Sequence, residues 1–338
     1  MSDTTDDRVW TLARHPTGTP SRGCFAFETR PRPEPAPGEA LVRTQYLSVD
    51  PYMRGRMRAG ESYAEPWDVG APLEGGVVGE VVASNGSSFD PGDRVVGTLQ
   101  WADYSVAPDH ALSRVDVGDL PASTALGVLG MPGRTAYFGT RAVAEPKPGD
   151  TMVVSAAAGA VGSVAGQLAA MAGARVVGTA GSQRKVDWLR ELGFDEAINY
   201  RAVDDYRAAL AEAAPDGVDV YFDNVGGPLT DAVFDHLNVD ARVAVCGQVA
   251  LYNAEERPVG PRKLWKLIER RAHVEGFLVS DFSARFETAT ADLHRWVEGG
   301  ALDYRETVTD GLENAPDAFL GLFEGENVGK QVVRVASA

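Results

Sequence analysis

The sequence predicts an α/β protein in which a doubly wound parallel sheet follows a β-rich unit. From Asp150 onward, apolar stretches of strand length alternate with amphipathic helical stretches, which is typical of an open parallel sheet covered on both faces. Residues 1 to about 125 hold short apolar runs separated by Pro and Gly, which favours short strands. The 338 residues also exceed one ordinary core of about 100 to 200 residues, so two units are expected.

The expected sheet has six strands, at residues 151–155, 174–179, 197–200, 218–222, 242–246 and 274–279. After the second strand, Ser182 suits a helix N-cap, Val186 and Leu189 share one helix face, and Gly193 suits the end. The pattern becomes irregular after about residue 300, and we expect this tail to return to the first unit. The predicted domains are therefore residues 1–130 plus 300–338, and residues 131–299.

Charge and composition restrict the partners and the location. The 32 Lys and Arg residues against 48 Asp and Glu give a net charge of −16, which disfavours nucleic acid and anionic membrane surfaces. Residues 152–174 carry no charge over the length of a membrane span, but their Ala, Gly and Ser content favours a buried strand, turn and helix. With two cysteines and a polar, acidic start, we expect no signal peptide and a cytoplasmic location.

A glycine-containing turn follows the first strand of the expected sheet. The run Ala157-Ala-Gly-Ala-Val-Gly162 matches the dinucleotide fingerprint with Ala at its first glycine position. Gly159 would let the backbone approach a pyrophosphate, Gly162 would allow close packing of helix on strand, and free helix N–H groups would face the anion. The alternative is a tight strand-to-helix turn without a ligand.

The end of the second strand indicates which dinucleotide is bound. NAD-selective sites place Asp or Glu there, whereas residues 179–185 contain no acid. Ser182 and Lys185 could bind the 2′-phosphate of NADP as a hydroxyl donor and a point charge. The alternative is that Arg184 and Lys185 form a solvated helix start.

Six stretches spread over the chain resemble a known family. They are residues 47–54, 131–137, 155–162, 220–227, 251–253 and 327–330. Together they resemble zinc-independent medium-chain dehydrogenases/reductases, in the branch of leukotriene dehydrogenase, prostaglandin reductase and NADPH-dependent curcumin reductase. The resemblance implies a Rossmann domain inserted in a GroES-like β-rich catalytic domain. It also implies NADP(H) as cofactor, a homodimer, and reduction of the carbon–carbon double bond of α,β-unsaturated ketones and aldehydes.

The resemblance also implies roles for individual residues. Gly159, Ala160, Val161 and Gly162 would cradle the pyrophosphate, and Lys185 and Tyr200 would hold the 2′-phosphate. The nicotinamide half would be bordered by Asn224, by residues 246–252 including Cys246, Gly247 and Tyr252, by Phe277, Leu278 and Val279, and by Asn327.

Reduction of an enone requires a donor for the carbonyl oxygen and a proton for the α-carbon. Tyrosine suits both needs because it is a neutral donor with a pKa near 10. Tyr252 resembles the family tyrosine near the nicotinamide ribose, and Tyr63 resembles one that faces the substrate. We expect Tyr252 and the ribose hydroxyl to stabilise the enolate and Tyr63 or a water to deliver the proton, with buried structural tyrosines as the alternative.

Other functions remain open at this stage. A quinone oxidoreductase of the same superfamily is the enzymatic alternative, and a non-catalytic NADPH-binding sensor is the alternative of another class. Arg54, Arg56 and Arg58 either help to hold a carboxylate-bearing substrate or belong to the scaffold. The five scattered histidines and two cysteines form no ligand pattern, so no metal site is expected.

Overall fold

The computed structural model describes residues 6–59, 64–256 and 258–336, and these residues form two compact units. Unit 1 takes its residues from the ranges 1–126, 306–327 and 331–338, and unit 2 from 127–305 and 328–330. The sequence-based domain boundaries at residues 130 and 300 stay a prediction.

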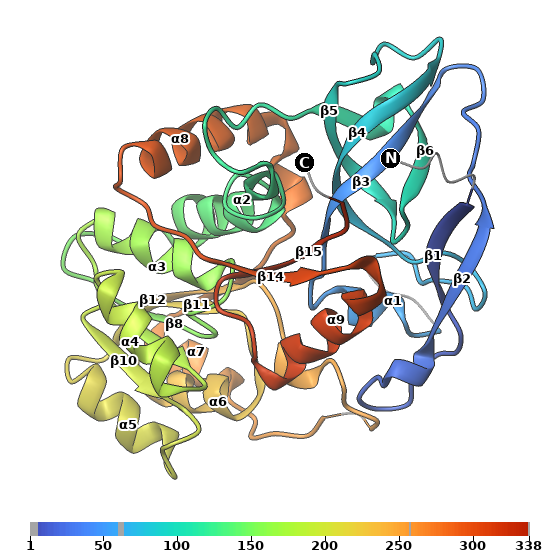
Figure 1. Cartoon of the computed structure of the whole chain (residues 1–338). Coiled ribbons are helices and arrows are strands. Elements are labelled where there is room, and N and C mark those ends of the chain that lie inside the picture. Colours follow the sequence, from blue (N-terminus) through green and yellow to red (C-terminus); the bar gives the residue numbers. More distant parts are fainter. Residues whose placement is uncertain (1–5, 60–63, 257, 337–338) are drawn as a thin grey trace. The chain divides into compact units, whose positions relative to one another are not determined.

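Unit 2 is built on a six-stranded sheet (Figure 1). Its strands are β8 (Thr151–Val154), β9 (Arg175–Ala180), β10 (Glu196–Asn199), β11 (Val218–Asp223), β12 (Leu237–Val245) and β13 (His273–Gly276). Their spatial order is β10-β9-β8-β11-β12-β13, and every neighbouring pair is parallel. This order reverses direction beside β8, as in a doubly wound sheet, so the predicted fold class is confirmed.

Seven helices of unit 2 follow or precede these strands. They are α2 (Met131–Phe138), α3 (Gly162–Met171), α4 (Gln183–Glu191), α5 (Tyr206–Ala213), α6 (Gly227–Asp235), α7 (Leu264–Arg270) and α8 (Phe286–Glu298). Within the described residues, no helix is long and apolar enough to cross a membrane. The uncharged stretch 152–174 instead forms β8, a turn and α3, as expected from its small residues.

Local sequence explains how the strands and helices of unit 2 begin and end. All four residues of β8 are buried, as in a central strand that is covered on both faces. Ser182 caps α4 by accepting a hydrogen bond from the Lys185 N–H, and Gly193 follows the helix with a φ of 85°. The predicted cap and end of this helix are therefore confirmed.

Two of the predicted strands differ from the observed ones by more than one residue at an end. β12 begins at Leu237, five residues before the expected start, and its register against β11 shifts between Val218 and Val220. β13 ends at Gly276 rather than at Val279. A 3₁₀ turn begins at Val279. The chain therefore leaves the sheet earlier than its apolar residues indicated.

Unit 1 is β-rich, as expected from its Pro and Gly content. Its larger sheet has seven strands, and a separate two-stranded sheet pairs β1 with β2. The elements are β1 (Asp6–Leu12), β2 (Phe25–Pro31), β3 (Glu39–Ser48), α1 (Met53–Arg56), β4 (Glu74–Asn85), β5 (Arg94–Gln100), β6 (Tyr104–Pro108), β7 (Leu112–Arg114), β14 (Glu306–Asp310), α9 (Ala315–Glu324) and β15 (Lys330–Arg334).

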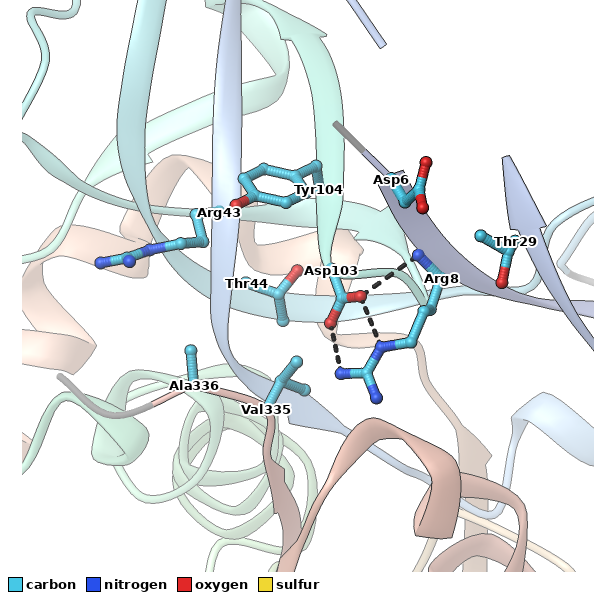
Figure 2. A pocket seen from close by; sticks show the side chains of 9 residues that line it. All are labelled: Asp6, Arg8, Thr29, Arg43, Thr44, Asp103, Tyr104, Val335 and Ala336. Atoms are coloured by element: carbon cyan, nitrogen blue, oxygen red, sulfur yellow. Dashed lines mark hydrogen bonds and ion pairs between the residues drawn. The ribbon is translucent and has the colours of Figure 1, made fainter. Parts of the chain in front are cut away.

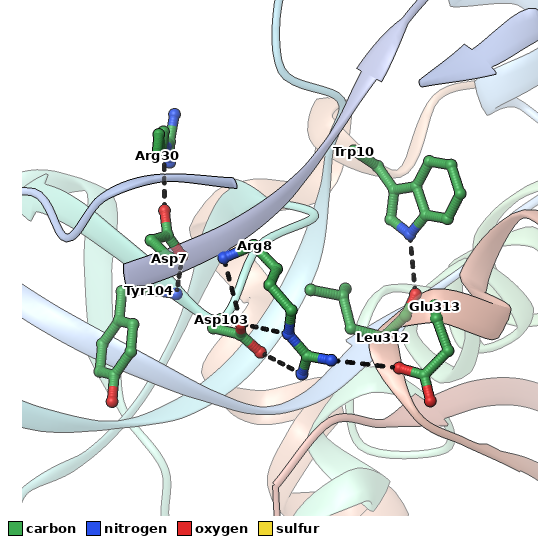
Figure 3. Close-up of polar contacts among 8 residues, drawn as sticks. All are labelled: Asp7, Arg8, Trp10, Arg30, Asp103, Tyr104, Leu312 and Glu313. Atoms are coloured by element: carbon green, nitrogen blue, oxygen red, sulfur yellow. Dashed lines mark hydrogen bonds and ion pairs between the residues drawn. The ribbon is translucent and has the colours of Figure 1, made fainter. Parts of the chain in front are cut away.

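Long-range polar contacts hold β1 in unit 1 (Figure 3). The Arg8 guanidinium forms a bidentate pair with Asp103, through Nε at 2.8 Å and Nη2 at 2.9 Å. Trp10 donates its indole N–H to the Leu312 carbonyl at 2.8 Å. Leu312 lies 302 residues later in the chain, so this buried bond joins the two chain ends within one unit.

Packing at Gly166 gives a test of the unit 2 core. A Cβ at this α3 position would lie 2.0 Å from the ring of Phe194, which is itself buried. We expect Gly166→Ala to lower the free energy of unfolding by about 1 kcal/mol or more, because overpacking outweighs the gain in helix propensity. Urea-induced unfolding measures the change.

Gly23→Ala is the matched control for this substitution. Its added Cβ would meet side-chain atoms at 3.7 and 3.9 Å, which are ordinary contacts. We expect this variant to stay within about 0.5 kcal/mol of the wild type. Equal stability of all three proteins would contradict the packing argument.

Candidate cofactor-binding site

The turn between β8 and α3 has the shape of an anion site. Ala156 adopts a φ of 48° there, which is uncommon for a residue with a side chain. A Cβ at Gly162 would lie 2.5 Å from the Ala156 carbonyl oxygen, and one at Gly159 would lie 3.2 Å from it. Among the described residues, no side chain caps the start of α3. Its first N–H groups are therefore suited to bind an anion, and Gly159, Ala160, Val161 and Gly162 form this turn.

A short segment from near the C-terminus completes this turn. Gly329 pairs with Gly159 in a parallel bridge, and its N–H donates to the Ala158 carbonyl at 2.9 Å. Gly329 has a φ of 67°, and a Cβ there would lie 1.9 Å from the Arg305 carbonyl oxygen. Glycine is therefore required at this position. Sequence reasoning placed Asn327 at the site but did not place Gly329 beside the phosphate turn.

Ser182 follows β9, and Tyr200 follows the neighbouring strand β10. The Ser182 hydroxyl accepts from the Lys185 N–H at 3.4 Å. The Tyr200 N–H donates to the Ala180 carbonyl at 3.0 Å, and a Cβ at Gly181 would lie 2.6 Å from the Tyr200 hydroxyl. The structure therefore brings together three residues that the sequence assigned to one phosphate.

Lys185, on the helix that Ser182 caps, is a buried cation. Only 9% of the residue is exposed. Desolvation, followed by the charges of Arg184 and Arg201, lowers the pKa of Lys185 to about 8. Sequence reasoning missed Arg201, although it directly follows Tyr200. Residues 179–185 contain Arg184 and Lys185 but no acid, and Arg201 adds a third cation, so this end of the sheet favours a ligand with an additional phosphate.

Asn224 and Tyr252 meet after β11 and β12. Asn224 is held by Ser155, because its side-chain amide donates to the Ser155 carbonyl at 2.7 Å and its N–H to the Ser155 hydroxyl at 2.8 Å. A Cβ at Gly247 would lie 3.3 Å from the Asn224 carbonyl oxygen and 3.4 Å from the Tyr252 hydroxyl. The Gln248 N–H donates to that hydroxyl at 3.5 Å, so the tyrosine oxygen serves as an acceptor in this bond.

Cys246 precedes this group and is chemically inert. Desolvation, followed by the charge of Asp223, raises the pKa of the Cys246 thiol to about 12. The sulfur is therefore a neutral thiol at neutral pH rather than a nucleophile. Cys246 could contribute contact surface to a ligand but no covalent chemistry.

Of the remaining predicted site residues, Phe277, Leu278 and Val279 follow β13 directly. The Phe277 ring packs 6.3 Å from Phe222 and 6.4 Å from Phe282, centroid to centroid. Leu278 is exposed, and Val279 begins the 3₁₀ turn after β13. Asn327 belongs to unit 1. Tyr63 lies outside the described residues.

The arginines of α1 have scaffold contacts. Arg54 is 1% exposed and donates through Nη2 to the Gly18 carbonyl at 2.7 Å. Arg56 donates to the Glu65 carbonyl at 2.9 Å and to Glu74 at 2.8 Å. These bonds support the scaffold interpretation for both residues. Arg58 is exposed.

Unit 1 also contains a hollow of about 510 Å³ (Figure 2). It is lined by Asp6, Arg8, Thr29, Arg43, Thr44, Asp103, Tyr104, Val335 and Ala336. Arg8 is engaged by Asp103 and Arg43 by Glu80. None of the predicted site residues lines this hollow. In the described part of the chain, no three His, Cys, Asp or Glu side chains are grouped to hold a metal ion.

Comparisons with known proteins agree with the whole architecture. Residues 8–115 match a family model described as the N-terminal domain of oxidoreductase, and residues 160–295 match one described as zinc-binding dehydrogenase. The chain is 45% identical to NADPH-dependent curcumin reductase of Escherichia coli over 338 residues, which is 98% of this chain and 97% of the relative. It is 46% identical to the NADP⁺-dependent 2-alkenal reductase of Nicotiana tabacum over 301 residues, 88% of each chain.

A solved structure is similar over almost the full length. The crystal structure of CurA from Vibrio vulnificus in complex with NADPH matches with a TM-score of 0.93 and 43% identity. The match covers 98% of this chain and 100% of the other.

Proposed function

Because the chain belongs to the medium-chain dehydrogenase/reductase family, in the branch of curcumin reductase, alkenal reductase and prostaglandin reductase, we propose that it reduces enones with NADPH. The reaction is reduction of the carbon–carbon double bond of α,β-unsaturated ketones and aldehydes. The observation that supports the cofactor choice is the buried Lys185, on the helix that Ser182 caps after the second strand, with Arg201 near enough to lower its pKa.

In this proposal, three groups of residues bind three parts of NADPH. Gly159, Ala160, Val161 and Gly162 hold the pyrophosphate, while Ser182, Lys185 and Tyr200 hold the 2′-phosphate. The nicotinamide half is bordered by Asn224, Cys246, Gly247, Tyr252, Phe277, Leu278, Val279 and Asn327. Residues 131–299 form the NADP-binding domain in this proposal, and residues 1–130 with 300–338 form the catalytic domain.

The chemistry requires two protein functions. Bound NADPH supplies a hydride to the β-carbon, which moves an electron pair onto the carbonyl oxygen. The Tyr252 hydroxyl donates a hydrogen bond to that oxygen and stabilises its negative charge. The α-carbon then takes a proton from Tyr63 or from a water, which gives the saturated carbonyl product.

The direct experiment measures NADPH oxidation at 340 nm against alkenals, enones, quinones and simple ketones. We expect turnover with alkenals and enones, and a product that is saturated at the former double bond. Faster turnover with quinones would favour the quinone oxidoreductase. NADPH binding without oxidation across the panel would favour a sensor, and turnover with simple ketones alone would indicate carbonyl reduction.

Lys185 predicts a pH-dependent choice between NADPH and NADH. A phosphate dianion binds better to the protonated amine, whose pKa in the free protein is about 8. Below that pH the amine is charged and affinity for NADPH is constant, whereas above it the amine loses its proton and affinity falls. We expect KM for NADPH to rise between pH 8 and 10 and KM for NADH to change little.

Two variants test the assignment of this pH effect. Lys185→Arg keeps its charge at every pH measured, so the rise in KM should disappear. Lys185→Met loses a charge-assisted hydrogen bond, so KM for NADPH should increase roughly 10- to 100-fold at pH 7, equivalent to about 1.5 to 3 kcal/mol. An unchanged KM for NADPH in Lys185→Met would remove Lys185 from the phosphate site.

Tyr252→Phe tests the donor to the carbonyl oxygen. Loss of one such donor lowers kcat by roughly 10²- to 10³-fold, or about 2.7 to 4 kcal/mol of transition-state stabilisation. NADPH affinity should stay within a few-fold, because the ring remains in place. Tyr206→Phe, on α5, is the control and should keep its kcat. Unchanged kcat and KM in Tyr252→Phe would end the assignment.

We also propose that the enzyme is a homodimer joined along β13. This strand is last in the sheet order, and within the described residues its outer edge has no partner strand. The helix that precedes this strand, α7, has three exposed apolar residues: Leu264 is 75% exposed, Trp265 56% and Ile268 82%. Antiparallel pairing of two β13 strands about Val274 places His273 opposite Glu275 on both sides, so the edge is complementary to itself.

Sedimentation of the purified chain tests this dimer. We expect a particle of twice the 36.0 kDa chain mass, and a single-chain particle for Ile268→Glu because a buried charge opposes association. Val69→Glu is the control, since Val69 is also exposed, at 55%, but lies in unit 1. A wild-type chain that sediments as a monomer, or an Ile268→Glu dimer, would contradict this interface.

A further inference from the structure

Asp223 is a fully buried carboxylate at the end of β11, and it accepts six hydrogen bonds. Its Oδ1 accepts from the Tyr221 hydroxyl at 2.9 Å, the Ser155 hydroxyl at 3.2 Å, and the N–H groups of Val225 and Gly226 at 2.9 Å each. Its Oδ2 accepts from the Thr230 hydroxyl at 2.8 Å and the Gln248 side-chain amide at 3.1 Å.

This arrangement requires a carboxyl group rather than an amide. All six donors are neutral, and they share the two carboxyl oxygens, which together offer about four lone-pair sites. Burial, together with the charge of Asp223, raises the pKa of Tyr221 well above its usual value, which keeps its hydroxyl a donor. Asn at this position would turn an NH₂ group toward hydrogen-bond donors.

Four of the six donors come from two separate turns. Val225, Gly226 and Thr230 belong to the turn after β11 and to α6, whereas Gln248 belongs to the turn after β12. The two turns are also joined through their backbones, because Gly247 donates to the Asp223 carbonyl and Ala250 to the Val225 carbonyl, both at 3.0 Å. Asp223 therefore binds both turns through its carboxylate oxygens.

Gln248 transmits this contact to Tyr252. Its side chain donates to Asp223 while its N–H donates to the Tyr252 hydroxyl at 3.5 Å. The fit around Gln248 is close, since a Cβ at Gly226 would lie 2.4 Å from Gln248 Oε1. A displacement of Gln248 would therefore displace the tyrosine hydroxyl with it.

We propose that Asp223 is a positioning residue, which fixes Tyr252 through Gln248 and fixes Asn224 through the turn after β11. This inference rests on the proposed function, because it assigns both residues to the nicotinamide half. Asp223 itself contacts neither cofactor nor substrate in this proposal. A misplacement of about 1 Å at a reacting centre lowers a rate by roughly 10²-fold, so a remote carboxylate can control kcat.

A matched pair of variants separates positioning from stability. Gln248→Leu and Thr230→Val each remove one donor to Asp223 Oδ2, but only Gln248 leads to Tyr252. We expect Gln248→Leu to lower kcat for an enone at least tenfold. Thr230→Val should lower the melting temperature yet keep kcat within twofold. Equal losses of kcat in the two variants, or unchanged kcat in Gln248→Leu, would overturn the proposal.

Binding measurements test the same proposal without turnover. Titration with NADPH and with adenosine 2′,5′-bisphosphate, which lacks the nicotinamide half, compares the two ends of the cofactor. We expect Gln248→Leu and Asp223→Asn to weaken NADPH binding severalfold and to leave bisphosphate binding within twofold. Equal weakening of both ligands would assign Asp223 to the general scaffold. Failure of the wild type to bind NADPH would instead overturn the proposed function.

Discussion

Parallel pairing of β8 with β9 and β11 is the constraint on which the candidate site depends. Parallel strands end at the same edge, so the turns after β8, β9, β11 and β12 are neighbours although they span about a hundred residues of sequence. β8 is buried along its full length, and a register slip of one residue would turn its side chains to the opposite faces. The positions of Gly159, Ser182 and Asn224 follow from this register rather than from contacts among the three.

The sequence could predict those parts of the site that local chain geometry determines. Gly159 and Gly162 are recognisable because a strand-to-helix turn that admits an anion has no room for a Cβ. Ser182 is recognisable because it caps a helix with a strong apolar face. In each case a few adjacent residues contain the physical reason, so the prediction needed no knowledge of tertiary contacts.

The sequence could not predict contacts that join distant segments. Nothing near Gly329 indicates that its N–H meets Ala158, which precedes it by 171 residues, because only the folded chain brings Arg305 close enough to require a glycine there. Asp223 lies within the stretch 220–227, but that stretch alone does not indicate a role for it, because its partners Ser155 and Gln248 follow other strands. The predicted end of β13 was wrong for a related reason: Phe277, directly after Gly276, packs on the rings of Phe222 and Phe282 instead of continuing the strand.

Charge is handled differently at the two ends of the candidate site. A chain with a net charge of −16 repels phosphates at long range, so Arg184, Lys185 and Arg201 must reverse the field locally to select a ligand with an additional phosphate. Around Asp223 a single anion is instead surrounded by neutral dipoles, which stabilise it without a cation that would compete for the Tyr252 hydroxyl. A cluster of cations suits recognition of a phosphate, whereas hydride transfer requires fixed distances, and a buried network of hydrogen bonds supplies them.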